Sequence, residues 1–158
     1  MNIFHIGEIV DMGIEKEKRR RDFYDLVSKR FGEGEVRELF ERLRDWETRH
    51  VQKFTAIRET LENDEAAESY SGELEAYMRS LVDERLYSKV APDEFSKNIS
   101  SILDAIEYAL GFEKDALLFF LELESYVTSA HKEVIQQLAN EEKQHIVYLS
   151  VLKKQIIA

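Results

Sequence analysis

The sequence predicts an all-α protein built as a bundle of four long helices. Only one proline and six glycines occur in 158 residues, of which 34% are charged and 44% hydrophobic, and this composition favours helices. Apolar residues recur at steps of three and four along four separate segments, as they do on one face of an α-helix. Each apolar stripe is interrupted by glutamate, or by glutamate and histidine, so these polar side chains should face the core.

The first two stripes form the first predicted helical hairpin. They span residues 6–31 and 36–61, and the second keeps alternating steps of four and three throughout. Residues 32–34 between them include two glycines, which should end the first helix. A connection this short makes the two helices antiparallel neighbours.

A segment of roughly 35 residues, from about residue 64 to residue 98, separates the two hairpins. Its first part is polar, residues 74–87 have the pattern of one short helix, and Pro92 favours a turn or a helix start. A connection of this length can cross the bundle. The third long helix should therefore run parallel to the second.

The last two stripes form the second predicted hairpin. They span residues 99–127 and 135–156, and their short connection again predicts antiparallel helices. A chain of 158 residues suits one domain with a sizeable core. We therefore expect residues 1–158 to form a single domain.

Four carboxylates and two imidazoles interrupt the four stripes. A lone glutamate stands on the first and third stripes and a Glu-x-x-His step on the second and fourth, so the set is Glu17, Glu47, His50, Glu113, Glu142 and His145. Glu47 and His50 recur 95 residues later as Glu142 and His145, and Glu17 recurs 96 residues later as Glu113. The matched offsets predict two similar halves that supply near-equivalent ligand sets.

This set of side chains predicts a site for two metal ions. Residues three apart on a helix share a face, so each Glu-x-x-His step can bind one cation or reach two neighbouring ones. Four uncompensated carboxylates in an apolar core would be very costly, and two divalent cations would neutralise them. One glutamate from each of two helices plus Glu-x-x-His from each of the other two is a known two-metal ligand set of four-helix bundles. Oxygen ligands with two imidazoles suit iron or manganese better than calcium or structural zinc.

Neighbouring residues leave alternatives open. Glu141 lies four residues before His145 and competes with Glu142, although the repeat offset favours Glu142. Glu107 is either an extra ligand or a solvated residue, and solvation is the commoner state of such a side chain. The alternative to a two-metal site is a bundle whose polar core residues bind no metal.

Further polar and aromatic residues have no clear role from spacing alone. Arg20 and Arg21 follow Glu17 by about one turn, and we expect one to extend outward and the other to pair with a carboxylate near the site. The remaining histidines lack a glutamate three residues before them and should lie on the surface: His5 and His131. Several aromatic residues could relay electrons, although helical spacing usually indicates packing: Tyr24, Tyr108, Tyr126, Tyr148 and Trp46.

Composition excludes several classes of function. The formal net charge of −10 would repel the phosphate backbone of nucleic acid. No cysteine is present, so thiolate metal sites and thiol catalysis are excluded. The N-terminus lacks a basic region followed by an apolar run, and no segment approaches the ~18 apolar residues that span a bilayer. We expect a soluble cytoplasmic protein that binds neither nucleic acid nor membrane.

Four short patterns, spread over nearly the whole chain, resemble a known family. They are "EKRRRDFY", in which Tyr24 follows Glu17 by seven residues, "ETRH", "EKDALLFF", in which Phe120 follows Glu113 by seven, and "EKQH". Together they resemble the rubrerythrin-like (erythrin) branch of the ferritin-like di-iron superfamily. The resemblance implies a ferritin-like bundle of two helical hairpins joined by a long crossover that contains a short helix.

The resemblance also implies a chemistry. The six residues would hold two iron ions, with manganese or zinc as substitutes, in a non-haem centre that reacts with dioxygen or hydrogen peroxide. An iron storage or delivery protein without turnover is the alternative. Ferritin-like relatives commonly form dimers, and the long middle segment could let a hairpin exchange between chains, so we expect a homodimer.

Two departures from the peroxidase-active rubrerythrins bear on that chemistry. Those proteins carry an additional glutamate one turn beyond the helix-three ligand, where this chain has Ala116. They also carry a cysteine-ligated rubredoxin domain, which 158 residues without cysteine do not contain. We therefore expect peroxide turnover to be less specialised, dioxygen to be used as well, and electrons to come from an unidentified donor.

Overall fold

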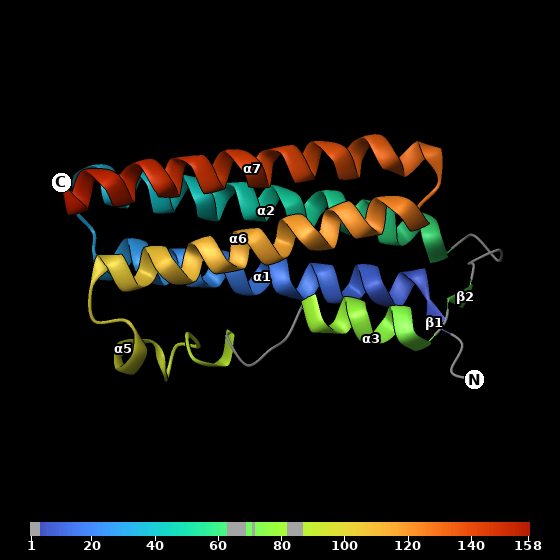
Figure 1. Ribbon diagram of the computed structural model, residues 1–158, viewed down its shortest axis with the longest axis horizontal. Coiled ribbons are helices and arrows are strands. Elements are labelled where there is room, and N and C mark those ends of the chain that lie inside the picture. The colour runs from blue at the N-terminus through green and yellow to red at the C-terminus, as the bar shows by residue number, and fades with distance from the viewer. Residues whose placement is uncertain (1–3, 63–68, 71, 82–86) are drawn as a thin grey trace.

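Four long helices lie side by side along the longest dimension of the molecule (Figure 1). The computed structural model describes residues 4–62, 69–70, 72–81 and 87–158. The long helices are α1 (Ile6–Arg30), α2 (Gly34–Glu62), α6 (Ile102–Leu123) and α7 (Ser129–Ile157). The prediction of an all-α, ferritin-like four-helix bundle is confirmed.

The helices run in the predicted directions. Within each hairpin, α1 with α2 and α6 with α7, the two helices are antiparallel, whereas α2 and α6 run the same way along the bundle (Figure 1). The turn between α1 and α2 ends at Gly34, whose φ of 55° is left-handed and favours glycine. A side chain at Gly32 would meet the carbonyl oxygen of Ser28 at 2.8 Å, so this turn requires both glycines.

The crossover between the hairpins contains the predicted short helix, α3 (Gly72–Leu81), and the predicted turn at Pro92. A further short helix, α5 (Phe95–Asn98), was not predicted. The crossover also contains the two-residue strand β2 (Ser69–Tyr70). This strand pairs antiparallel with β1 (Phe4–His5), which precedes α1, and the sequence did not predict the pairing. A two-residue ladder has no periodicity by which to recognise it.

Local capping corrects the predicted bounds of the third helix. The Ser101 side chain accepts from the backbone of Asp104, and Asp104 bonds back to the backbone of Ser101, so α6 begins only after this capping box. Ile99 is buried but precedes the helix. At the other end α6 passes into η1 (Glu124–Tyr126), so the buried Val127 lies in the connection to α7.

The core consists of two apolar clusters at opposite ends of the bundle. Each long helix contributes to both, for example Ile9, Phe54, Phe120 and Leu138 to the first and Phe23, Phe40, Phe112 and Leu149 to the second. On every helix the predicted ligands lie between the two contributing segments. The clusters therefore enclose a polar layer half-way along the bundle. Among the described helices, none is both long and apolar enough to cross a membrane.

Candidate metal centre

All six predicted ligands lie in this enclosed layer. Each has at most 1% of its surface exposed. Glu17 comes from α1, Glu47 and His50 from α2, Glu113 from α6, and the last pair from α7. Burial of four carboxylates together is the feature that requires compensation by positive charge.

The side chains form two groups, each able to hold a metal ion. The first, which we call the His50 group, consists of Glu17, Glu47, His50 and Glu142. The second, the His145 group, consists of Glu47, Glu113, Glu142 and His145. Within each group one ligand atom per residue lies within 4.8 Å of every other. Glu47 and Glu142 belong to both groups.

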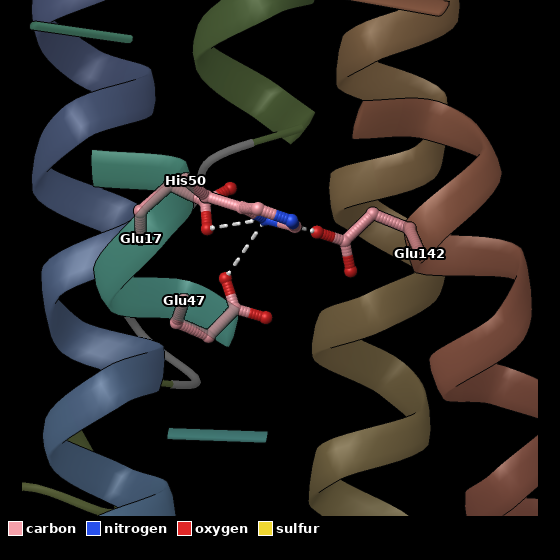
Figure 2. A group of neighbouring side chains, drawn as sticks. All are labelled: Glu17, Glu47, His50 and Glu142. Atoms are coloured by element: carbon pink, nitrogen blue, oxygen red, sulfur yellow. Dashed lines mark ion pairs between the residues drawn. The ribbon is translucent and has the colours of Figure 1, made fainter. Parts of the chain in front are cut away.

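Each shared carboxylate directs one oxygen toward each histidine. Nδ1 of His50 lies 2.9 Å from Oε1 of Glu142 and 3.4 Å from Oε2 of Glu47. Nδ1 of His145 lies 3.3 Å from Oε2 of Glu142 and 3.6 Å from Oε1 of Glu47. Figure 2 shows Glu17, Glu47 and Glu142 converging on His50 from three helices. Each of the two shared carboxylates could therefore contact an ion held by either group.

The donor atoms themselves fit a pair of metal ions. Seven of them are buried and have no hydrogen-bond partner among the described residues: Oε2 of Glu17, Oε1 of Glu47, Nδ1 of His50, Oε2 of Glu113, both oxygens of Glu142 and Nδ1 of His145. Buried polar atoms are normally satisfied. These acceptors are directed at one volume, so the residues present fit a site that cations could complete.

The family comparison agrees with this geometry. The family model described as Rubrerythrin matches residues 8–153. The chain belongs to the rubrerythrin family. Among curated proteins and among solved structures, no significant match was found.

In this rubrerythrin-family protein Glu141 lies behind His50, in neither group of candidate ligands. Its Oε2 accepts from Nε2 of His50 at 2.5 Å, and its other oxygen lies 3.5 Å from Nζ of Lys53. The hydrogen bond to His50 lowers the pKa of Glu141 to about 2. A proton held on Nε2 leaves the Nδ1 lone pair directed at the shared carboxylates, as a metal ligand requires.

The two remaining carboxylates have different partners. The hydroxyl of Tyr24 donates to Oε1 of Glu113, which lies across the bundle on α6. Glu17 instead accepts from Nη2 of Arg20 on its own helix. The aromatic residue at the position equivalent to Tyr24 is Phe120, which packs against Phe54 with ring centroids 5.2 Å apart. It has no hydroxyl to offer Glu17.

Aromatic side chains cover the outer face of His145. The Trp46 ring stacks on the imidazole at 4.8 Å between centroids, and Tyr148 stacks on Trp46 at 5.8 Å. The guanidinium of Arg42 lies 5.5 Å from the Trp46 centroid and 5.6 Å from that of Tyr148. Because Tyr148 is 39% exposed, a continuous aromatic contact connects the surface with a candidate ligand.

The two arginines after Glu17 have opposite positions. Arg20 is 2% exposed and reaches the site, while Arg21 points outward and pairs with Asp22 at 3.1 Å. Spacing predicted this division of roles but could not say which arginine is which. Arg20 and Arg21 differ by about 100° around a helix, and the rotation of α1 in the bundle decides between them.

The other candidates lie outside the site. Glu107 is exposed and pairs with Lys153, so it belongs to the solvated surface. His131 is partly buried in the first turn of α7 and belongs to neither ligand group. The side chain of His5 lies outside the described residues.

Without cations the cluster holds protons. Burial acts to lower the pKa of His145, but the carboxylates of Glu142 and Glu47 outweigh it and raise that pKa to about 9. The pKa of His50 is raised for the same reason, with Glu47 as the largest contributor. The pKa of Glu142 is lowered to about 2 although burial opposes this, because both histidines and Arg20 lie beside it. Imidazolium–carboxylate pairs thus take the place of metal–carboxylate pairs.

Proposed function

We propose that this rubrerythrin-family protein holds two iron ions and that the iron pair is oxidised by dioxygen or hydrogen peroxide. The observation that carries the proposal is the position of Glu47 and Glu142, each with one oxygen beside His50 and the other beside His145. Two donor groups that share two carboxylates fit two cations held as a pair.

The charges and donor types support the same proposal. Glu17 and His50 would complete one position, and Glu113 and His145 the other, around the shared carboxylates. Four carboxylates balance two divalent cations, and the oxygen-rich donor set with imidazole suits iron, with manganese or zinc as substitutes. When bound, a ferrous pair can supply two electrons to dioxygen or peroxide.

Side chains around the ligands would fix their geometry. Tyr24 orients Glu113 through its hydroxyl, and Glu141 orients His50 through Nε2. Apolar clusters on both sides keep water from the carboxylates and strengthen their interaction with any cation. Ala116 is 5% exposed and provides no carboxylate one turn beyond Glu113, so we expect oxidation by dioxygen alongside peroxide.

Repeated turnover would need an electron donor. The 158 residues contain no cysteine that could bind an iron–sulfur centre. The contact from Tyr148 through Trp46 to His145 offers a path by which electrons could enter from the surface. We propose that the donor reduces the site by this route.

We also propose that the protein works as a homodimer. Apolar side chains are exposed on the outer faces of the second hairpin: Leu118, Leu121, Val147 and Val151. Burying such residues against a second copy would remove them from water. A concentration-independent monomer mass in light scattering would reject this assembly.

Iron loading followed by rapid oxidation tests the proposed function. Metal-free protein is loaded anaerobically with excess ferrous iron, desalted, analysed for iron, and mixed with dioxygen or peroxide while near-ultraviolet absorbance is recorded. We expect about two irons per chain and an absorbance change that saturates at that ratio. Uptake far beyond two irons would favour storage, and protein that retains no iron would favour a metal-free bundle.

A further inference from the structure

Arg20 lies beside the carboxylate oxygens that face His50. Its Nη2 donates to Glu17 and lies 3.5 Å from Oε2 of Glu47 and 3.9 Å from Oε1 of Glu142. Those two oxygens are the ones that face Nδ1 of His50. The guanidinium therefore contacts all three carboxylates of the His50 group.

The second half of the chain has no counterpart of this arginine. The position three residues after Glu113 is Ala116, whose methyl group carries neither charge nor donor. The carboxylate of Glu113 accepts instead from the neutral hydroxyl of Tyr24. A cation in the His145 group would therefore bind Glu113 without competition from an arginine. A cation in the His50 group would compete with Arg20 for Glu17.

We propose that Arg20 is a tethered cation that makes the two metal positions unequal, so that the His145 position binds first and the His50 position binds second and more weakly. This inference rests on the proposed two-metal function and revises the near-equivalence that the repeat offsets predict. A divalent ion at the His50 position must displace Arg20 from Glu17, and it is repelled by the nearby guanidinium. Both effects lower its affinity.

A small cavity beside the site would let the guanidinium of Arg20 shift away from Glu17. A cavity of about 10 Å³, room for roughly one water molecule, is lined by Arg20, Asp115 and Tyr87 among others. Asp115 is partly buried, and it lines this cavity together with Arg20. The Asp115 carboxylate is therefore the partner that Arg20 would meet when it withdraws from Glu17.

Stepwise titration of the metal-free, full-length protein with Co²⁺ alone tests the inference. Calorimetry and the visible absorption of bound Co²⁺ report each step without reference to turnover. For the wild type we expect one tight step and a second that is weaker by at least roughly tenfold, given a cation within about 4 Å. In Arg20→Met, which keeps an unbranched side chain without the charge, the two affinities should approach each other. Arg21→Met is the matched control and should titrate like the wild type.

Histidine variants assign the two steps to their positions. His50→Ala should remove the weak step and leave the tight one, and His145→Ala should remove the tight one. Asp115→Asn should weaken the second step in the wild type and have no effect in the Arg20→Met background. If Arg20→Met does not fold, as judged by circular dichroism, the wild-type and histidine titrations still decide the order of binding.

The outcomes separate this inference from the function on which it rests. Two equal steps in the wild type, unchanged in Arg20→Met, would overturn the role of Arg20 and leave the two-metal centre intact. Loss of the tight step in His50→Ala would overturn the proposed order. A wild type that binds no Co²⁺ would contradict the two-metal centre itself.

Discussion

On the His50 side of the centre, Glu17 is bonded to the guanidinium of Arg20, whereas on the His145 side, Glu113 accepts a hydrogen bond from the hydroxyl of Tyr24. One carboxylate thus faces a full positive charge and the other a neutral donor. The difference arises although both halves of the chain offer the same ligand types at matched offsets.

The residues that contact the two histidines from outside the site also differ between the two halves. Glu141, which precedes Glu142, bonds to the outer nitrogen of His50, while Trp46, which precedes Glu47, stacks on His145. One imidazole is thereby held by a carboxylate and the other is covered by an aromatic ring that leads to the surface. The two halves agree in the atoms that would touch metal and differ in what surrounds them. A repeated ligand pattern predicts how many metal positions exist but does not predict that they are equal.

The largest expected effect is the loss of a carboxylate that both positions share. Glu47→Ala and Glu142→Ala should each weaken binding at both positions by more than about 100-fold, because loss even of an outer partner can cost that much. Iron per chain after anaerobic loading and desalting measures this, with the exposed Glu107→Ala as control. Retention of two irons by either variant would contradict the sharing of these carboxylates.

Stability should depend on pH in opposite ways with and without metal. The pKa of His145 is raised from its ordinary value of 6.5 to about 9, so its contribution in metal-free protein is complete below pH 6.5 and is lost as pH rises to 9. The contribution of His145 to the free energy of unfolding is about 3 kcal/mol at most. The pKa of Glu142 is lowered from 4.5 to about 2, so its contribution is complete above pH 4.5 and is lost as pH falls to 2.

Metal binds deprotonated imidazole, so its stabilising effect should grow over the range in which the metal-free protein weakens. Thermal unfolding of chelated and Mn²⁺-loaded samples between pH 6 and pH 9 measures both curves. The melting temperatures should diverge as pH rises. Parallel curves, or equal melting temperatures throughout, would count against a metal site in the core.

Removal of the outer partners should have smaller effects, each confined to one position. Glu141→Gln should weaken the His50 position by roughly tenfold, since outer-shell partners of a ligating histidine are worth about that much. Tyr24→Phe should weaken the His145 position by less, because it removes one hydrogen bond to Glu113. Co²⁺ titration resolves the two steps, and an equal loss from both positions in either variant would contradict the one-sided contacts.

The smallest expected effect concerns the rate of reduction. Trp46→Leu should slow reduction of oxidised, iron-loaded protein by a large chemical reductant severalfold, while Trp46→Phe, which keeps an aromatic ring over His145, should slow it less. The initial oxidation by dioxygen should be nearly unchanged, which separates electron entry from damage to the site. Identical reduction rates in all three proteins would exclude this path.

Sequence alone predicted the fold and brought the six candidate ligands together, because both depend on helical periodicity. Their neighbours depend instead on how the helices are rotated against one another. Glu141 meets His50, and Tyr24 meets Glu113, across about 90 residues of chain. From spacing, Glu141 was considered only as an alternative ligand to Glu142, and no hydrogen-bond partner was predicted for Tyr24. The burial of Tyr87, Val90 and Phe95 in the crossover was not predicted, because residues 87–99 have no helical stripe.

Anomalous scattering from a crystal of the Co²⁺-loaded protein would show whether Glu47 and Glu142 are shared by two metal ions. We expect two peaks per chain at saturation, one beside Nδ1 of His50 and one beside Nδ1 of His145, with oxygens of Glu47 and Glu142 near both. At one equivalent of Co²⁺ the peak beside His145 should be the stronger. A saturated crystal with no peak between these helices, or with peaks that share no carboxylate, would contradict this expectation.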